Sequence, residues 1–221
     1  MESRLTNLQE EILAAFFRRE SEFFLTGGGA LAGFYLGHRE THDLDLFTTG
    51  TDLDSGVQTL TEVADETGAV LEGLQTSPDF KRFLVRRGVE AVVVDLVRER
   101  VAQLYPEKRR IRSIVVDPPE EILANKLCAL LSRAEVRDLV DLKTLEEAGY
   151  PIETALEPAS RKDGGLTPAQ LAWVVGQIEI PDGAPIPGNV SPVALREYLA
   201  GLRARLVLAG FPAMAKERSN E

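Results

Sequence analysis

The stretch Thr26-Gly-Gly-Gly-Ala-Leu31, followed by His38-Arg-Glu-Thr-His-Asp43-Leu-Asp45-Leu-Phe47, decides the fold of this chain. Residues 23–25 are apolar, which predicts a short strand directly before the glycines. Gly27, Gly28 and Gly29 predict a turn, because glycine tolerates positive φ and allows close approach to the backbone. A helix over residues 30–36 would direct its free N–H groups toward that turn, where an anion is favoured. The stretch therefore predicts a strand, a phosphate-binding turn, a helix and a second strand.

The second strand carries two carboxylates at alternating positions. Asp43 and Asp45 alternate with Leu44 and Leu46, so strand geometry places both carboxylates on one face. Adjacent carboxylates repel unless a cation lies between them, and Mg²⁺ prefers hard oxygen ligands together with substrate phosphates. A glycine turn alone is commonly structural, and an Asp-x-Asp pair alone is commonly a solvated edge. Their occurrence together, in this order, favours a phosphate cradle beside a metal site.

A third carboxylate lies near the end of an apolar segment. Residues 80–86 and 89–97 predict a hairpin, and the second segment is apolar enough to predict a central strand. Asp95 lies in that strand, where a buried carboxylate is costly unless it is paired or bound to metal. It either forms a salt bridge or serves as a third metal ligand, and the presence of Asp43 and Asp45 favours the metal.

Length and composition limit the class of protein. The chain has 221 residues, 44% of them hydrophobic, which suits one large domain or two small ones. Its apolar runs are too short to span a bilayer, and its beginning does not resemble a signal peptide. A single cysteine excludes a disulfide framework and indicates a reducing cytoplasm, and two histidines make a structural zinc site improbable. We therefore expect a cytoplasmic protein with no membrane partner.

The charge of the chain is uneven. The net charge of −10 argues against indiscriminate nucleic-acid binding. Between Lys81 and Arg112, however, ten basic residues stand against four acidic ones, a local excess of six positive charges. This basic strip, residues 81–112, is either a phosphate-binding face or a strand edge protected by charge.

The second half of the chain looks entirely helical. A basic segment followed by Asp117-Pro118-Pro119 suggests a boundary, which we place between a core of residues 1–112 and a helical part of residues 113–221. Within the helical part, Lys126 and Arg133 share one side of a helix, and Asp138 and Asp141 share a face of the next. Antiparallel packing would juxtapose these cations and carboxylates. They form either an ordinary salt-bridge set or a site in which Lys126 reaches a triphosphate. The order of elements predicts an α+β fold.

These motifs resemble the DNA polymerase β-like nucleotidyltransferase superfamily, and more closely its AbiEii/AbiGii-type toxin branch. The resemblance covers residues 20–150 and rests on four motifs: Gly27-Gly28-Gly29-Ala30-Leu31, Arg39-x-Thr41-x-Asp43-Leu-Asp45-Leu, Lys126-Leu-x-Ala-Leu-x-x-Arg133 and Arg137-Asp138-x-x-Asp141-Leu142. It implies a mixed polymerase β-like sheet followed by helices. It also implies transfer of a nucleoside monophosphate from an NTP to an acceptor. In toxins of this branch the acceptor is tRNA, and a cognate antitoxin silences the activity.

The resemblance assigns roles to the motif residues. Asp43, Asp45 and Asp95 would hold Mg²⁺ or Mn²⁺, and Asp95 is also a candidate acceptor for the hydroxyl proton. Nucleotide contacts are implied for these residues: Gly27, Gly28, Gly29, Arg39, Thr41, Lys126 and Arg133. Lys126, Asp138 and Asp141 are implied at the catalytic centre. Two alternatives remain: nucleotidyl transfer to a small molecule such as an aminoglycoside, and a non-catalytic nucleotide-binding relative.

Overall fold

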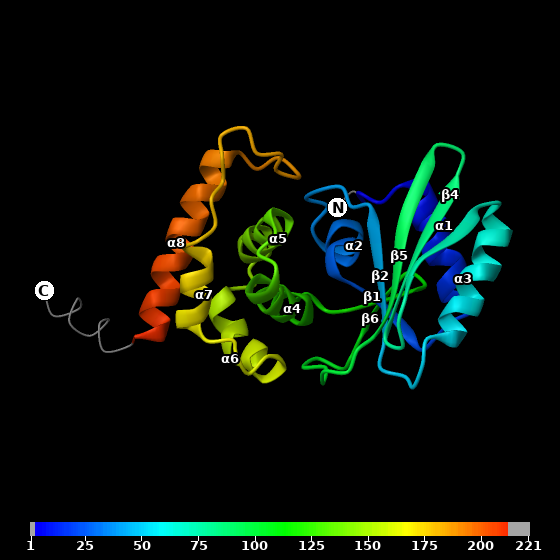
Figure 1. The fold of residues 1–221 in the computed structure, drawn as a ribbon, viewed down its shortest axis with the longest axis horizontal. Coiled ribbons are helices and arrows are strands. Elements are labelled where there is room, and N and C mark those ends of the chain that lie inside the picture. Colours follow the sequence, from blue (N-terminus) through cyan, green and yellow to red (C-terminus); the bar gives the residue numbers. More distant parts are fainter. Residues whose placement is uncertain (1–2, 212–221) are drawn as a thin grey trace, which may run out of the picture. The chain divides into compact units, whose positions relative to one another are not determined.

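A seven-stranded mixed sheet forms the first part of the computed structural model, which describes residues 3–211 (Figure 1). The strand order is β3-β4-β5-β2-β1-β7-β6. The strands are β1 Phe23–Thr26, β2 Asp43–Thr48, β3 Val70–Thr76, β4 Phe80–Arg87, β5 Glu90–Arg98, β6 Arg109–Ile111 and β7 Ile114–Val116. β5 lies between β4 and β2, so the central position predicted for this strand is confirmed.

The chain divides into two compact units, which we call the sheet unit, Met1–Pro119, and the helical unit, Glu120–Glu221. The sequence placed the boundary after residue 112. β7 lies beyond that position and pairs with β1 through Leu25 and Val116, which makes residues 114–116 part of the sheet. The sheet unit therefore extends to Pro119, the residue at which the first helix of the second half begins.

Two helices cover one face of the sheet. α1, Asn7–Phe17, and α3, Asp54–Thr67, contact each other beside the strands (Figure 1). Phe23 of β1 packs its ring edge-on against Phe16 of α1, with ring centroids 5.6 Å apart, and it also fills the space beside Gly56 of α3. Side chains three positions apart in a strand point to opposite faces, so Thr26 points away from α1 and α3. Asp45 pairs directly with Thr26 and shares that second face.

The glycine segment differs from the expected turn. α2 begins at Gly27 and continues to Ala30, and a π-helical turn follows over Leu31–Tyr35. The expectation of a turn followed by a helix from residue 30 was wrong, because Gly27 with φ of 64° reverses the chain within a single residue. The glycines are therefore the first turn of the helix itself.

The helical unit consists, within the described residues, of α4 Pro119–Ser132, α5 Val136–Glu147, α6 Ile152–Lys162, α7 Pro168–Val175 and α8 Pro192–Gly210 (Figure 1). Thr167 and Ser191 cap α7 and α8 by accepting from backbone N–H groups, and a proline follows each cap. The predicted all-helical part is confirmed from Glu120 to residue 211, whereas residues 114–116, which the prediction placed in it, form β7. Between residues 3 and 211, no helix has the length and apolar character needed to cross a membrane.

Candidate active site

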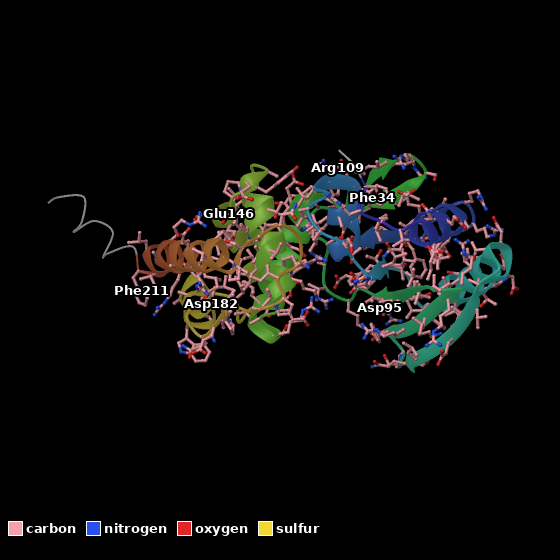
Figure 2. All side chains as sticks on the ribbon, turned by 90° about the horizontal axis from the view of Figure 1, so that it is seen from above. Phe34, Asp95, Arg109, Glu146, Asp182 and Phe211 are labelled. Carbon is pink, nitrogen blue, oxygen red and sulfur yellow. The ribbon has the colours of Figure 1, made fainter. Side chains whose placement is uncertain are left out.

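Polar side chains form a row across four neighbouring strands on the face that α1 and α3 leave uncovered. Thr26 of β1 pairs with Asp45 of β2, Asp45 pairs with Asp95 of β5, and Asp95 pairs with Arg82 of β4. Directly paired residues of adjacent strands present their side chains on the same face. Asp43 lies on this face too, because it precedes Asp45 by two residues. The three carboxylates predicted from the sequence are therefore neighbours in the sheet. Figure 2 labels the position of Asp95.

Each of the three glycines lies against a predicted site residue. A Cβ atom on Gly27 would lie 2.3 Å from Oδ2 of Asp45, and one on Gly28 would lie 2.5 Å from Nη2 of Arg39. A Cβ atom on Gly29 would lie 3.3 Å from the backbone oxygen of Asp43. A side chain at either of the first two positions would force Asp45 or Arg39 to move. The structure thus brings the glycine segment, Arg39 and both β2 carboxylates together.

Thr41 orients Asp43. Its hydroxyl donates to Oδ1 of Asp43 at 2.7 Å, and the residue is buried. Gln9, which the sequence analysis did not single out, holds Thr41 in turn by donating from Nε2 to the Thr41 carbonyl at 2.9 Å. The Thr6-x-x-Gln9 capping box could have indicated Gln9, since its Oε1 accepts from the N–H of Thr6 at 2.8 Å. One buried amide therefore links the start of α1 to the loop before β2.

Asp95 is held by Arg82, a residue that the sequence analysis counted only as part of the basic strip. Nε and Nη2 of Arg82 donate to the two carboxylate oxygens of Asp95 at 2.8 and 2.7 Å. The hydrogen bonds that Arg82 donates to Asp95 raise the pKa of its guanidinium, and the charges of Asp95, Asp45 and Asp43 add to that shift. Of the two alternatives for Asp95, the salt bridge is therefore present. The role of Asp95 as a metal ligand stays a prediction.

The donor set of this face suits a hard divalent cation in its chemistry. Asp43, Asp45 and Asp95 supply carboxylate oxygens from adjoining positions of two paired strands, and such oxygens are the ligands that Mg²⁺ and Mn²⁺ prefer. In the conformation described, no three acidic, histidine or cysteine side chains of residues 3–211 converge into a set that would enclose a metal. Both oxygens of Asp95 face the guanidinium of Arg82 instead. Any ion would thus have to share Asp95 with Arg82.

The helical unit contains a second cluster, and its members are those predicted from helix spacing. Nζ of Lys126 on α4 lies 2.7 Å from Asp138 and 2.6 Å from Asp141, both on α5. Arg133 also contacts Asp138, at 3.1 Å from its Nε. Burial works against the charge of Lys126, but the two carboxylates outweigh it and hold its pKa above the ordinary range. The cluster is a buried ion-pair network, and contact with a triphosphate stays a prediction.

The sequence of residues 11–183 matches the family described as Nucleotidyl transferase AbiEii toxin, Type IV TA system. This match spans well over half of the chain. The chain belongs to the AbiEii nucleotidyltransferase toxin family. No curated protein matches the sequence.

Solved structures agree with this AbiEii assignment in fold. A candidate nucleotidyltransferase from H. pylori superposes with a TM-score of 0.59 at 18% identity, over 90% of this chain and 91% of that one. JHP933 from Helicobacter pylori superposes with a TM-score of 0.57 at 17% identity, over 96% of this chain and 93% of that one. At such identities the likeness concerns the fold alone. The predicted polymerase β-like fold, a mixed sheet with helices followed by an all-helical part, is confirmed.

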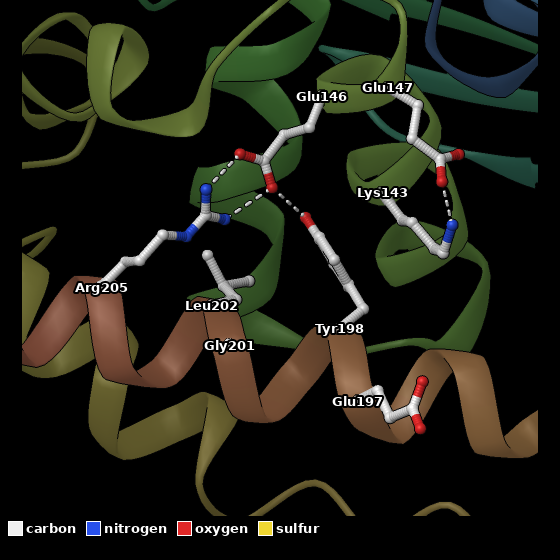
Figure 3. A pocket seen from close by; sticks show the side chains of 8 residues that line it. All are labelled: Lys143, Glu146, Glu147, Glu197, Tyr198, Gly201, Leu202 and Arg205. Carbon is white, nitrogen blue, oxygen red and sulfur yellow. Dashed lines mark hydrogen bonds and ion pairs between the residues drawn. The ribbon is translucent and has the colours of Figure 1, made fainter.

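The hollow shown in Figure 3 lies in the helical unit of this AbiEii protein and contains no predicted site residue. Glu146 of α5 accepts from the Tyr198 hydroxyl at 2.8 Å and from Arg205 at 2.9 and 2.7 Å, both on α8. Burial opposes the charge of Glu146, but Arg205 and Tyr198 outweigh it and hold its pKa below the ordinary carboxyl range. These contacts tie α5 to α8, so we assign the cluster to the stability of the helical unit.

The basic strip of this AbiEii protein is largely neutralised. Seven of its basic residues pair with acids: Lys81, Arg82, Arg86, Arg87, Arg98, Arg100 and Lys108. Arg110 and Arg112 form no ion pair within residues 3–211, and both are exposed on the β6–β7 hairpin. The strip therefore does not form a continuous face of unpaired positive charge that could bind phosphates. Its uncompensated charge gathers at this hairpin.

Proposed function

We propose that this AbiEii protein transfers a nucleoside monophosphate from an NTP to a hydroxyl group of tRNA, acting as a toxin that a cognate antitoxin restrains. The observation that carries the proposal is the contact between Gly27 and Asp45. It joins a glycine segment able to approach phosphate and a strand face bearing Asp43, Asp45 and Asp95. Family membership supports nucleotidyl transfer, and this arrangement supports the assignment of the reaction to these residues.

Each residue of the sheet unit has a role in this proposal. The backbone N–H groups of Gly27, Gly28 and Gly29 would bind phosphate oxygens, since glycines have no side chains of their own to keep a phosphate away from the backbone. Thr41 fixes Asp43 in one orientation through its hydroxyl, which limits the reorganisation needed to bind an ion. Arg39, buried against Gly28, supplies a fixed positive charge beside the glycine segment.

Mg²⁺ or Mn²⁺, held by Asp43 and Asp45 with Asp95 as a further ligand, would supply activation of the acceptor hydroxyl and charge neutralisation at the triphosphate. The protein would contribute mainly positioning, because the site holds carboxylates and no histidine or cysteine nucleophile. Asp95 is the candidate acceptor for the hydroxyl proton whenever its oxygens are not bound to Arg82.

The distribution of charge on the sheet unit bears on the identity of the acceptor. The exposed Arg110 and Arg112 of the β6–β7 hairpin support a polyanionic acceptor such as tRNA. The extensive ion pairing of the remaining strip favours the alternative, a small acceptor such as an aminoglycoside, for which an acidic protein is better suited. Both readings use the same carboxylates.

The test is incubation with each labelled NTP and Mg²⁺, in one arm with total tRNA and in another with an aminoglycoside. We expect label on tRNA with the wild-type protein and a loss of about 100-fold or more with Asp45→Asn. Asp54→Asn is the matched control, because Asp54 is an exposed acid of the same unit that pairs with Lys81. Equal labelling by Asp45→Asn and wild type would refute the site. Label on the aminoglycoside alone would transfer the proposal to a small acceptor.

A further inference from the structure

The row of polar side chains across the sheet contains one cation among its acids. Arg82 of β4 pairs with Asp95 of β5, which pairs with Asp45 of β2, and all three side chains share one face. Asp43 lies on the same face two residues before Asp45. All three carboxylates therefore lie within the electrostatic influence of the Arg82 guanidinium.

The contact between Arg82 and Asp95 has the bidentate geometry of the stronger arginine–carboxylate pairs. Nε donates to Oδ1 at 2.8 Å and Nη2 donates to Oδ2 at 2.7 Å, so both oxygens of Asp95 are engaged. The side chain of Asp95 is 6% exposed, whereas that of Arg82 is 42% exposed. The carboxylate is thus fixed in the sheet. The arginine approaches from the solvent side and is the partner able to withdraw.

A divalent cation and this guanidinium need the same oxygens. Both carboxylate oxygens of Asp95 already accept a hydrogen bond from Arg82, so an ion that binds Asp95 has to share these oxygens with the guanidinium and lie close to its positive charge. The guanidinium also lies within the electrostatic influence of Asp45 and Asp43, where its positive charge opposes the arrival of a second cation.

We propose that Arg82 is a built-in counter-cation that competes with the divalent metal for Asp95 and thereby sets the metal affinity of the site. In the absence of metal, Arg82 relieves the repulsion within the row of carboxylates and stabilises the sheet. On metal binding, the ion shares the oxygens of Asp95, and the contact of Arg82 with them weakens. The inference rests on the proposed function in one respect, the binding of a divalent metal by Asp43, Asp45 and Asp95.

The test measures Mn²⁺ binding to the intact protein without nucleotide, by the loss of the electron paramagnetic resonance signal of free Mn²⁺. Arg82→Gln should bind Mn²⁺ about three- to tenfold more tightly than wild type, because the competing charge is gone. Arg86→Gln is the matched control. Arg86 lies on the same strand and pairs with Glu72 at 3.6 Å, in an ion pair with both side chains more than half exposed, so its loss should leave Mn²⁺ affinity unchanged.

Thermal unfolding gives a second readout. Without metal, Arg82→Gln should melt at a lower temperature than wild type, because Asp95 is left buried and unpaired. Added Mn²⁺ should raise its melting temperature more than that of wild type. If Arg82→Gln does not fold, Arg82→Lys serves instead. It keeps the charge without the bidentate fork, so its Mn²⁺ affinity should exceed that of wild type by a smaller factor.

Unchanged or weaker Mn²⁺ binding by the Arg82 variants would overturn the proposal. That failure differs from failure of the proposed function. If Asp45→Asn abolishes nucleotidyl transfer while the Arg82 variants bind Mn²⁺ as wild type does, the function stands and competition by Arg82 is wrong. If wild type and Arg82→Gln both bind no Mn²⁺ at millimolar concentration, the metal site itself is wrong and the inference falls with it.

Discussion

Gly27 has a positive φ and also lies against Asp45, and both features favour glycine there. A comparison with Gly68, which has only the first feature, distinguishes the two effects. Gly27 and Gly68 have φ values of 64° and 65°. A Cβ atom on Gly68 would meet nothing within 4 Å, whereas one on Gly27 would meet Oδ2 of Asp45 at 2.3 Å. Gly68→Ala should cost only the left-handed backbone penalty of about 1–2 kcal/mol. Gly27→Ala should cost about 1–3 kcal/mol more, because Asp45 must move.

Urea unfolding of the two variants, combined with NTP turnover, measures this difference. We expect Gly68→Ala to keep full turnover and Gly27→Ala to lose most of it, since the displaced carboxylate is a proposed metal ligand. Equal losses of stability with equal turnover would show that Gly27 serves the backbone alone.

Individual residues were predictable where local pattern determines them. Asp43 and Asp45 could be placed on one face because alternation within a strand needs no information from elsewhere in the chain. The pairing of Arg82 with Asp95 could not be predicted, because it depends on the register between β4 and β5. The bounds expected for the two strands did not determine that register. The sequence showed ten basic residues in the strip but not which of them had partners.

Lys126 and Arg133 contact the same carboxylate, Asp138, but Lys126 is buried and Arg133 is partly exposed. Lys126 is buried between Asp138 and Asp141, so Lys126→Ala should destabilise the protein by about 3–5 kcal/mol by removing the ammonium group that these two buried carboxylates share. Loss of NTP binding in that variant would therefore be ambiguous. Arg133 touches the same Asp138 with a side chain that is 45% exposed, and Arg133→Gln should cost less than about 1 kcal/mol.

Arg133→Gln thus tests the predicted nucleotide contact without dismantling the cluster. If the cluster binds the triphosphate, the variant should weaken NTP affinity about three- to tenfold at nearly unchanged melting temperature. Arg161→Gln is the control, because the ion pair that Arg161 forms with Glu157 on α6 is exposed. Wild-type NTP affinity in Arg133→Gln would favour a purely structural ion-pair network.

Long elements were easier to foresee than short ones. Gly68 ends α3 in the left-handed conformation that its position after an amphipathic segment indicated. The three-residue strands β6 and β7 were missed, because three residues carry too little pattern to indicate a strand. They pair with each other, and β7 joins the sheet through β1, a long-range contact that local sequence does not reveal. The division into a sheet followed by helices could be predicted because the spacing of apolar residues changes from the period of strands to the period of helices along the chain.

An acceptor as highly charged as tRNA poses a problem for a protein with a net charge of −10. Most basic residues of the strip form ion pairs with acids of the sheet unit, so any attraction for a polyanion has to come from a small part of the surface. The β6–β7 hairpin offers such a place, since Arg110 and Arg112 are exposed there. Arg112 has a positive φ of 56°. Arginine and glutamate both have a Cβ atom and adopt this conformation at a similar cost, so Arg112→Glu leaves the backbone penalty unchanged.

Binding to tRNA should therefore depend on where charge is removed and not only on how much. We compare Arg110→Glu/Arg112→Glu with Arg86→Glu/Arg100→Glu, two pairs that change the net charge equally. Arg86 and Arg100 already pair with Glu72 and Asp79. The hairpin variant should bind tRNA at least about tenfold more weakly at low salt, and its slope of log affinity against log salt should fall by about 1.5–2, one phosphate contact per arginine. NTP affinity should not change in either variant. Equal weakening by both pairs would mean that overall charge governs binding, and salt-independent or absent binding by the wild type would exclude tRNA as the acceptor and favour a small one.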